Sequence, residues 1–114
     1  MNLDELVTSV PEAKLKVELL QWVAEWKKDS SDVNRLYELA AKWHGNTWFA
    51  DSQAQNQFWA NLQIFKQQAI NGLGGMTVNE RLYWFGLFDE WDSLSEAEQE
   101  RVRTKLHASA IQVA

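Results

Sequence analysis

Apolar side chains recur every three or four residues along most of this chain, and no segment alternates as a strand would. The pattern predicts helices over residues 2–10, 11–28, 32–44, 52–71, about 78–91 and 96–110. In the second of these, the apolar side chains form one stripe at Leu15, Leu19, Trp22, Val23 and Trp26. Polar side chains occupy the opposite side, as expected for a helix that packs one face on a core.

Turn and capping residues mark the boundaries of these helices. Serine or threonine precedes glutamate by three positions, the spacing of a capping box, at Ser9–Glu12, Thr77–Glu80 and Ser95–Glu98. Asn2 is the expected cap of the first helix. Gly45 suits a left-handed cap at the end of the third helix. The glycine-rich segment 72–75 separates the fourth helix from the fifth.

The fifth predicted helix, about 78–91, is the most apolar part of the chain. It has no charged residue from Leu82 to Phe88, so we expect it to be buried on most sides. Gly86 inside this helix would cost about 1 kcal/mol relative to alanine, which the close approach of a neighbouring helix would explain. The prediction is an all-α fold: a single domain over residues 1–114, with five or six helices around this central helix.

Two features of the middle of the chain have two interpretations each. Trp48 and Phe49 lie beside turn residues, so they either fill the core or project from a loop. The outer face of the fourth helix carries amides where charges are usual, at Gln53, Gln55, Asn56, Gln57, Asn61, Gln63, Gln67 and Gln68. These amides are either solvated or form a hydrogen-bonding surface for a protein partner, with Trp48, Phe49 and Trp59 as its candidate anchors.

Composition narrows the class of protein. An apolar fraction of 46% excludes a disordered chain, and the seven tryptophans are more than a core of this size needs. The net charge of −5 argues against binding nucleic acid through its phosphates, and it favours either simple solubility or a basic partner. The chain has no cysteine, no signal peptide pattern and no apolar run of membrane-spanning length. We therefore expect a cytoplasmic protein that does not enter a membrane.

No motif for catalysis or for binding a cofactor is present. His44 and His107 are far apart in sequence, lie near predicted helix C-termini and belong to no metal-binding pattern. Residues 72–75 lack the context of a phosphate-binding loop, and no nucleophile elbow occurs. We expect a protein that is not an enzyme and that has no metal or cofactor.

Acidic residues are concentrated late in the chain. Six acids and no base lie between positions 89 and 100, at Asp89, Glu90, Asp92, Glu96, Glu98 and Glu100. One interpretation is that they cap a helix N-terminus or are solvated. The other is that they form a docking face for a positively charged groove, such as the nucleic-acid groove of a nuclease. Trp91, Trp48 and Trp59 are then the candidate aromatic anchors of that contact.

The segment 77–92, TVNERLYWFGLFDEWD, resembles a recurring NERLYxxGLxDE(F/W)D-like stretch in small bacterial helical proteins. Some of these are immunity proteins of contact-dependent toxin systems. The resemblance implies a cytoplasmic antidote that binds a toxin domain and occludes its active site, without cofactor or turnover. The shared positions are then architectural, with Glu80 as a cap and packing residues at Leu82, Tyr83, Leu87 and Trp91.

Our leading hypothesis is an immunity or antitoxin-type protein that neutralises a toxic nuclease domain through an acidic and aromatic surface. The alternatives are a nucleic-acid mimic that inhibits a host defence enzyme and a structural adaptor or oligomer built on exposed tryptophan. The mimic would need acids spaced like phosphates across several helices, whereas these acids cluster in one segment. A monomer is the favoured state in this hypothesis.

Overall fold

The computed structural model describes residues 1–108 of the chain. Six α-helices and no strand lie in this range, so the predicted all-α class is confirmed. The helices are Leu3–Thr8 (α1), Ala13–Lys28 (α2), Val33–Gly45 (α3), Ser52–Phe65 (α4), Val78–Trp84 (α5) and Glu96–Lys105 (α6). A π-helical turn, Lys66–Ile70, continues α4, and short 3₁₀ turns lie at Leu73–Gly75 and Trp91–Ser93.

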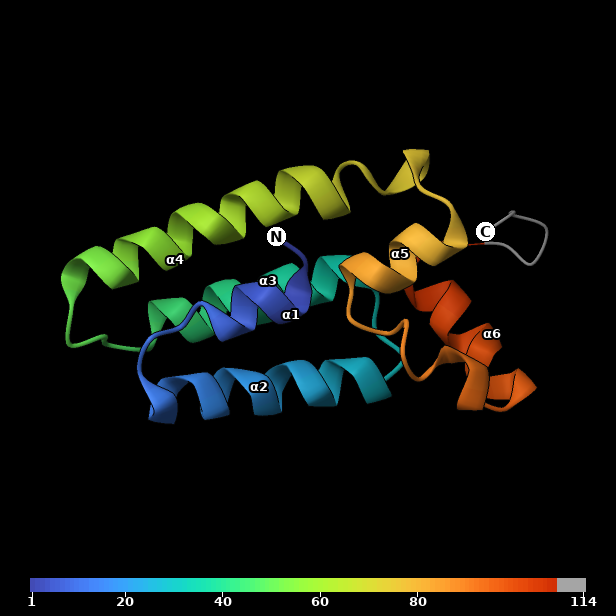
Figure 1. Cartoon of the computed structure of the whole chain (residues 1–114), viewed down its shortest axis with the longest axis horizontal. Helices are drawn as coiled ribbons and strands as arrows, with labels where there is room; N and C mark the ends of the chain where they lie inside the picture. Colours follow the sequence, from blue (N-terminus) through green and yellow to red (C-terminus); the bar gives the residue numbers. More distant parts are fainter. Residues whose placement is uncertain (109–114) are drawn as a thin grey trace.

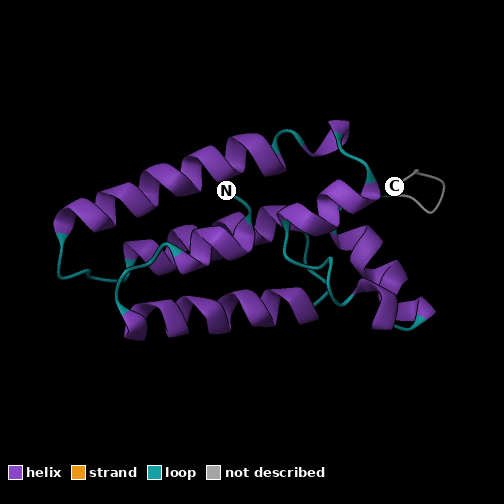
Figure 2. Cartoon of the chain, in the orientation of Figure 1, coloured by secondary structure: helices purple, strands orange, loops and turns teal. Residues whose placement is uncertain are grey.

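The first four helices form an up-and-down bundle. Each of them contacts the next along the chain, and α1 also contacts α4, which closes the ring. Figure 1 shows α1 between α2 and α4, with α3 behind it, while α5 and α6 lie together at one end. Short loops join the bundle helices (Figure 2). The molecule is elongated, measuring 46 × 25 × 20 Å.

Aromatic side chains fill both ends of the core. Near α5, the fully buried ring of Phe85 lies 6.0 Å from Trp26 of α2 and 5.5 Å from Phe65. Near the α3–α4 loop, the ring of Trp43 lies 5.3 Å from Phe58. Leucine, valine and alanine side chains occupy the space between these clusters. The core therefore runs the whole length of the bundle.

The fifth helix is shorter than its pattern predicts. It ends at Trp84 rather than near residue 91, because Gly86 takes a left-handed conformation with φ of +70°. The amide of Leu87 donates to the carbonyl of Leu82 (2.9 Å), and the amide of Gly86 donates to that of Tyr83 (3.3 Å). This is a Schellman cap. It returns Leu87 to the core, so Gly86 ends the helix instead of lying inside it.

Full capping boxes form at three of the six helix starts. Asn2, Thr77 and Ser95 each accept a hydrogen bond from the third residue of their helix and form full capping boxes. The predicted box at Ser9–Glu12 is wrong, because α2 begins without a side-chain cap. The Glu12 carboxylate instead accepts a hydrogen bond from the amide of Ala50 at 2.8 Å.

Two other predicted helix ends differ. Gly45 is the last residue of α3 and does not have a positive φ, so the expected left-handed cap is wrong. The last helix ends at Lys105, where Leu106 is the C-cap. The predicted extension of that helix to residue 110 includes positions 109 and 110, which lie outside the described residues.

Basic side chains attach α6 to the end of α2. The ammonium of Lys105, which is 1% exposed, donates to the carbonyls of Trp26 and Ser31 and to the Asp29 carboxylate. Arg101 donates to two further carbonyls in the same region, at 3.1 and 2.8 Å. Burial lowers the pKa of Lys105. Burial would raise the pKa of Asp29, but hydrogen bonds from Ser31 and Lys105 outweigh it and lower that pKa.

Candidate partner-binding surfaces

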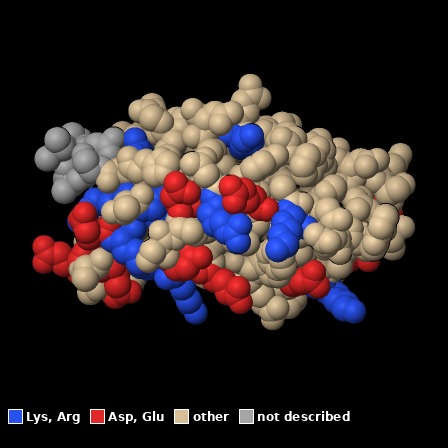
Figure 3. All heavy atoms as spheres, turned by 180° about the vertical axis from the view of Figure 1, so that it is seen from behind, with Lys and Arg blue, Asp and Glu red and all other residues tan. Residues whose placement is uncertain are grey.

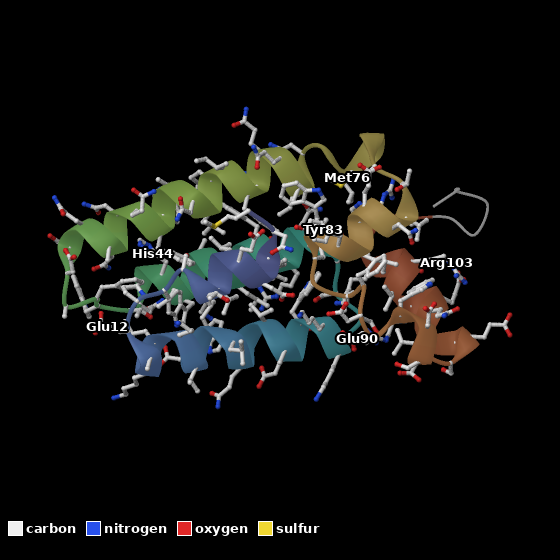
Figure 4. The ribbon with its side chains drawn as sticks, in the orientation of Figure 1. Glu12, His44, Met76, Tyr83, Glu90 and Arg103 are labelled. Carbon is white, nitrogen blue, oxygen red and sulfur yellow. The ribbon has the colours of Figure 1, made fainter. Side chains whose placement is uncertain are left out.

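The structure separates the predicted contact residues into two groups. The six acids and Trp91 lie on the segment that follows α5 and on α6, whereas Trp48 and Trp59 lie where α3 meets α4. Figure 4 labels Glu90 in the half of the molecule that contains α5 and α6, and His44 in the opposite half. We call the first group the acidic end and the second, with its neighbouring groove, the aromatic end.

Four acids of the acidic end have no partner among residues 1–108. All six acids are exposed. Glu98 accepts hydrogen bonds from Ser95 in the capping box, and Glu100 forms an ion pair with Arg103 at 2.7 Å. The remaining carboxylates make no ion pair or side-chain hydrogen bond within residues 1–108, and they belong to Asp89, Glu90, Asp92 and Glu96. These four are the acids that a partner can engage without breaking the fold.

Basic side chains partly offset this negative charge. Arg101, Arg103 and Lys105 follow the acidic segment in α6, and Figure 3 shows red and blue atoms side by side at that end. Arg103 also lies over the Trp91 ring, 5.7 Å from its centroid. Trp91 is half-buried, and its carbonyl accepts a hydrogen bond from Gln99. Trp91 therefore packs under α6 as well as bordering the acids.

The two adjacent aromatics of the α3–α4 loop, for which the sequence left two interpretations, have different environments. Phe49 is 7% exposed and packs 5.9 Å from the Trp43 ring, whereas Trp48 is 86% exposed. The Gln55 side chain accepts a hydrogen bond from the amide of Phe49 and donates one to the carbonyl of Thr47. These bonds fix the loop on both sides of Trp48, so the indole is held out in solvent by an ordered backbone.

A mostly apolar groove of about 530 Å³ lies beside this loop. Its lining residues come from the second half of α3 and from the middle of α4, and they are Ala41, His44, Gly45, Asn56 and Trp59. Trp59 is 40% exposed, and its ring lies 5.1 Å from that of His44. His44 is held in place because its Nε2 donates to the carbonyl of Gln55 at 3.0 Å. The walls of the groove are therefore ordered.

The amides of α4 divide between internal and surface positions. Gln63 exchanges hydrogen bonds with the Tyr37 hydroxyl, and Gln55 holds the α3–α4 loop. Gln57 donates to Asn61 along the helix surface. The other exposed amides give α4 a polar but uncharged outer face. Two of the eight amides thus have a structural role that the sequence pattern did not reveal.

The histidines lie at opposite ends of α3. His44 belongs to its last turn, and His107 pairs with the N-cap residue Asp32 at 2.9 Å. Within residues 1–108, no three histidine, aspartate or glutamate side chains are close enough to hold a metal ion together. In the same range, no helix is long and apolar enough to span a bilayer.

Comparison with known proteins identifies no relative of this chain. No family model, no curated protein sequence and no solved structure matches it.

Proposed function

We propose that this protein is an immunity-type inhibitor that binds a toxin domain through the acidic end and blocks its active site. The observation that carries the proposal is the set of four exposed acids that have no partner within residues 1–108, at Asp89, Glu90, Asp92 and Glu96. A nuclease domain presents a complementary surface, because it binds phosphates with lysine and arginine. The resemblance of residues 77–92 to immunity proteins supports the same assignment.

The fold supports this role by holding the acidic segment at both of its ends. Before the segment, the Schellman cap at Gly86 places Leu87 in the core. After it, the Ser95 capping box starts α6, and Lys105 attaches that helix to α2. A surface that is ordered before binding loses less conformational entropy on association. The acids are thus presented to a partner in a fixed arrangement.

Electrostatic attraction would act mainly on the rate of association. Complementary charges accelerate encounter between proteins and select among partners, and salt screens the effect. The exposed aromatics next to the acids, Phe88 and the partly exposed Trp91, would supply apolar contact area at the centre of the interface. A nucleic-acid mimic is less well supported, because the acids lie on one segment rather than across several helices.

The test begins with capture of the partner from the source cell, followed by assay of the purified partner for nuclease activity. The proposal expects one equivalent of this chain to abolish that activity. Association rates are then compared for the wild type and the double variant Asp89→Lys, Asp92→Lys. These positions are chosen because Glu98 and Glu100 stabilise α6, so their replacement would disturb the helix itself.

The matched control is Glu25→Lys, Glu38→Lys, which changes the net charge equally at exposed positions of α2 and α3. Among residues 1–108, Glu38 pairs only with Arg35 at the surface, an interaction that contributes little to stability. At low salt, we expect the test variant to associate at least about tenfold more slowly than the control. Equal rates for the two variants, or a partner that stays active when bound, would contradict the proposal.

A further inference from the structure

A cavity of about 310 Å³ lies where the beginning of α3 meets α5. The rest of its wall comes from the π-helical and 3₁₀ turns that follow α4 and from His107, just after α6. Figure 1 shows the first turn of α3 at the same end of the molecule as α5. None of the six acids of the acidic end lines this cavity, so it is separate from the surface assigned to the toxin domain.

Arg81 of α5 contributes a buried positive charge to the cavity wall. Its side chain is 2% exposed. Its Nε donates to the carbonyl of Met76 at 3.2 Å, and its Nη1 donates to the carbonyls of Leu106 and His107 at 3.0 and 2.6 Å. These acceptors are neutral, and no carboxylate of residues 1–108 forms an ion pair with Arg81. Buried charges in proteins are normally paired with an opposite charge.

The second terminal nitrogen of Arg81, Nη2, is directed at the cavity. It makes no hydrogen bond to any of the residues that the structure describes. In the same range, no fully buried side-chain nitrogen or oxygen lacks a partner, so Nη2 must be accessible to solvent. Arg81 lines the cavity and is otherwise enclosed, so Nη2 is accessible there. The cavity therefore contains N–H donors of a cation.

The other lining residues favour a ligand that is partly apolar. The chain has sixteen aspartates and glutamates, and none of them lines this cavity. Three aliphatic side chains, Val33, Ile70 and Leu73, form part of the wall. Asn34 and Asn71 add neutral amides, which can donate hydrogen bonds to an oxygen. The wall thus combines one guanidinium with an apolar surface.

The acid next to the cavity wall in sequence, Asp32, already has partners. Its carboxylate accepts hydrogen bonds from the amides of Asn34 and Arg35, at 3.1 and 3.3 Å, as the N-cap of α3. It also pairs with Nε2 of His107 at 2.9 Å. Asp32 therefore does not neutralise Arg81, which leaves the guanidinium available to an anion from solution.

We propose that this cavity binds a small organic carboxylate, with its carboxylate on Nη2 of Arg81 and its aliphatic part against Val33, Ile70 and Leu73. A hydrogen bond from a guanidinium to a carboxylate is among the stronger ones in proteins. The volume lies at the lower end of the range for small-molecule sites, which limits the ligand to a few carbon atoms. Inorganic phosphate fits less well, because the aliphatic part of the wall offers it no donor.

Nuclear magnetic resonance titration of the isotope-labelled full chain with sodium butyrate, at constant ionic strength, tests the site. We expect saturable shifts at the amides of Asn34 and Gly74 and at Nε of Arg81, with a dissociation constant on the order of millimolar. Butanamide, which has a similar shape but no charge, and inorganic phosphate should each bind at least about tenfold more weakly. Butyrate without saturable shifts would overturn the proposal, as would butanamide or phosphate that binds equally well.

A pair of glycine variants tests the location of the site without removing Arg81, whose hydrogen bonds also hold α5 to the end of α6. Gly74 lines the cavity and Gly75 does not, and a Cβ added at either meets no atom within 4 Å. Gly74→Glu places a carboxylate at the cavity and should raise the dissociation constant for butyrate at least about tenfold. Gly75→Glu, the matched control, should change it less than about twofold.

Circular dichroism checks that both variants are folded. Equal binding of butyrate by the two variants would refute the site. The titration contains no toxin domain, so its result is independent of the proposed function. Failure of butyrate to bind would leave the role of the acidic end untouched, and failure of toxin binding would leave this cavity as a carboxylate site.

Discussion

Replacing Lys105 by methionine removes the ammonium that joins α6 to the end of α2 but keeps a similar aliphatic chain. In the wild type, this ammonium donates to the carbonyls of Trp26 and Ser31, the latter at 2.6 Å, and to the carboxylate of Asp29 at 3.0 Å. It also lies 4.1 Å from the centroid of the Trp26 ring. The variant loses all of these contacts together.

Two opposing effects determine the size of the change. A hydrogen bond from a charged group contributes about 1.5–3 kcal/mol, and a buried acceptor without a donor costs about 1–3 kcal/mol. Methionine, however, avoids the burial of an ammonium, the same burial that lowers the pKa of Lys105. Asp29 is half-exposed, so water can replace its lost partner. We expect a net loss of about 3 kcal/mol, the lower end of the range for breaking a buried pair.

Urea unfolding followed by far-ultraviolet circular dichroism measures this loss as a shift of the midpoint at constant slope. The melting temperature should fall by about 10 °C. Lys28→Met is the control, because Lys28 is an exposed lysine in the last turn of α2 and should change stability by less than about 0.5 kcal/mol. Equal stability of the two variants would show that the bonds of Lys105 only balance its burial, and would refute the stabilising role given to it.

Two further predictions concern stability. Gly86→Ala should destabilise the fold by at least about 1 kcal/mol, because φ of Gly86 is +70° and the new Cβ would lie 2.6 Å from the Asp4 carboxylate. Thermal unfolding measures this loss. The control is Gly74→Ala, because a Cβ added at Gly74 has no neighbour within 4 Å. A hydrogen bond from His107 lowers the pKa of Asp32 below its ordinary value of 3.8. The ionised Asp32 carboxylate therefore stabilises the fold fully above pH 3.8, and this stabilisation is lost as the pH falls through the lower pKa that Asp32 has in the folded state. In Asp32→Asn, the free energy of unfolding from urea titrations should therefore fall less steeply at acidic pH than in the wild type. An unchanged pH dependence would contradict the stabilising role of the ionised Asp32 carboxylate.

The sequence pattern predicted the helices where local signals and tertiary packing agree. The stripe on α2 and the caps at Asn2, Thr77 and Ser95 depend on residues within a few positions, and they are present in the structure. The end of α5 was missed, because an apolar run with a glycine fits either a buried helix or a helix followed by a tight turn. The choice between them depends on the φ of Gly86, which hydrophobic periodicity does not report.

The candidate surfaces could be predicted only in part. The acids between 89 and 100 are exposed, as a cluster of charges indicates. Their distance from Trp48 follows from the path of α4 and was not visible in the sequence. The contact of Lys105 with Trp26 joins positions 79 residues apart, and no local spacing signals it. Tertiary topology decides which charges remain free for a partner and which hold the fold together.

The short first helix has a consequence for how the chain acquires its structure. α1 has six residues, too few for a stable isolated helix, and its apolar side chains are buried against helices that follow it. Its contact with α4 requires residues more than 40 positions later. During synthesis, α1 can therefore complete its packing only after α4 has been made.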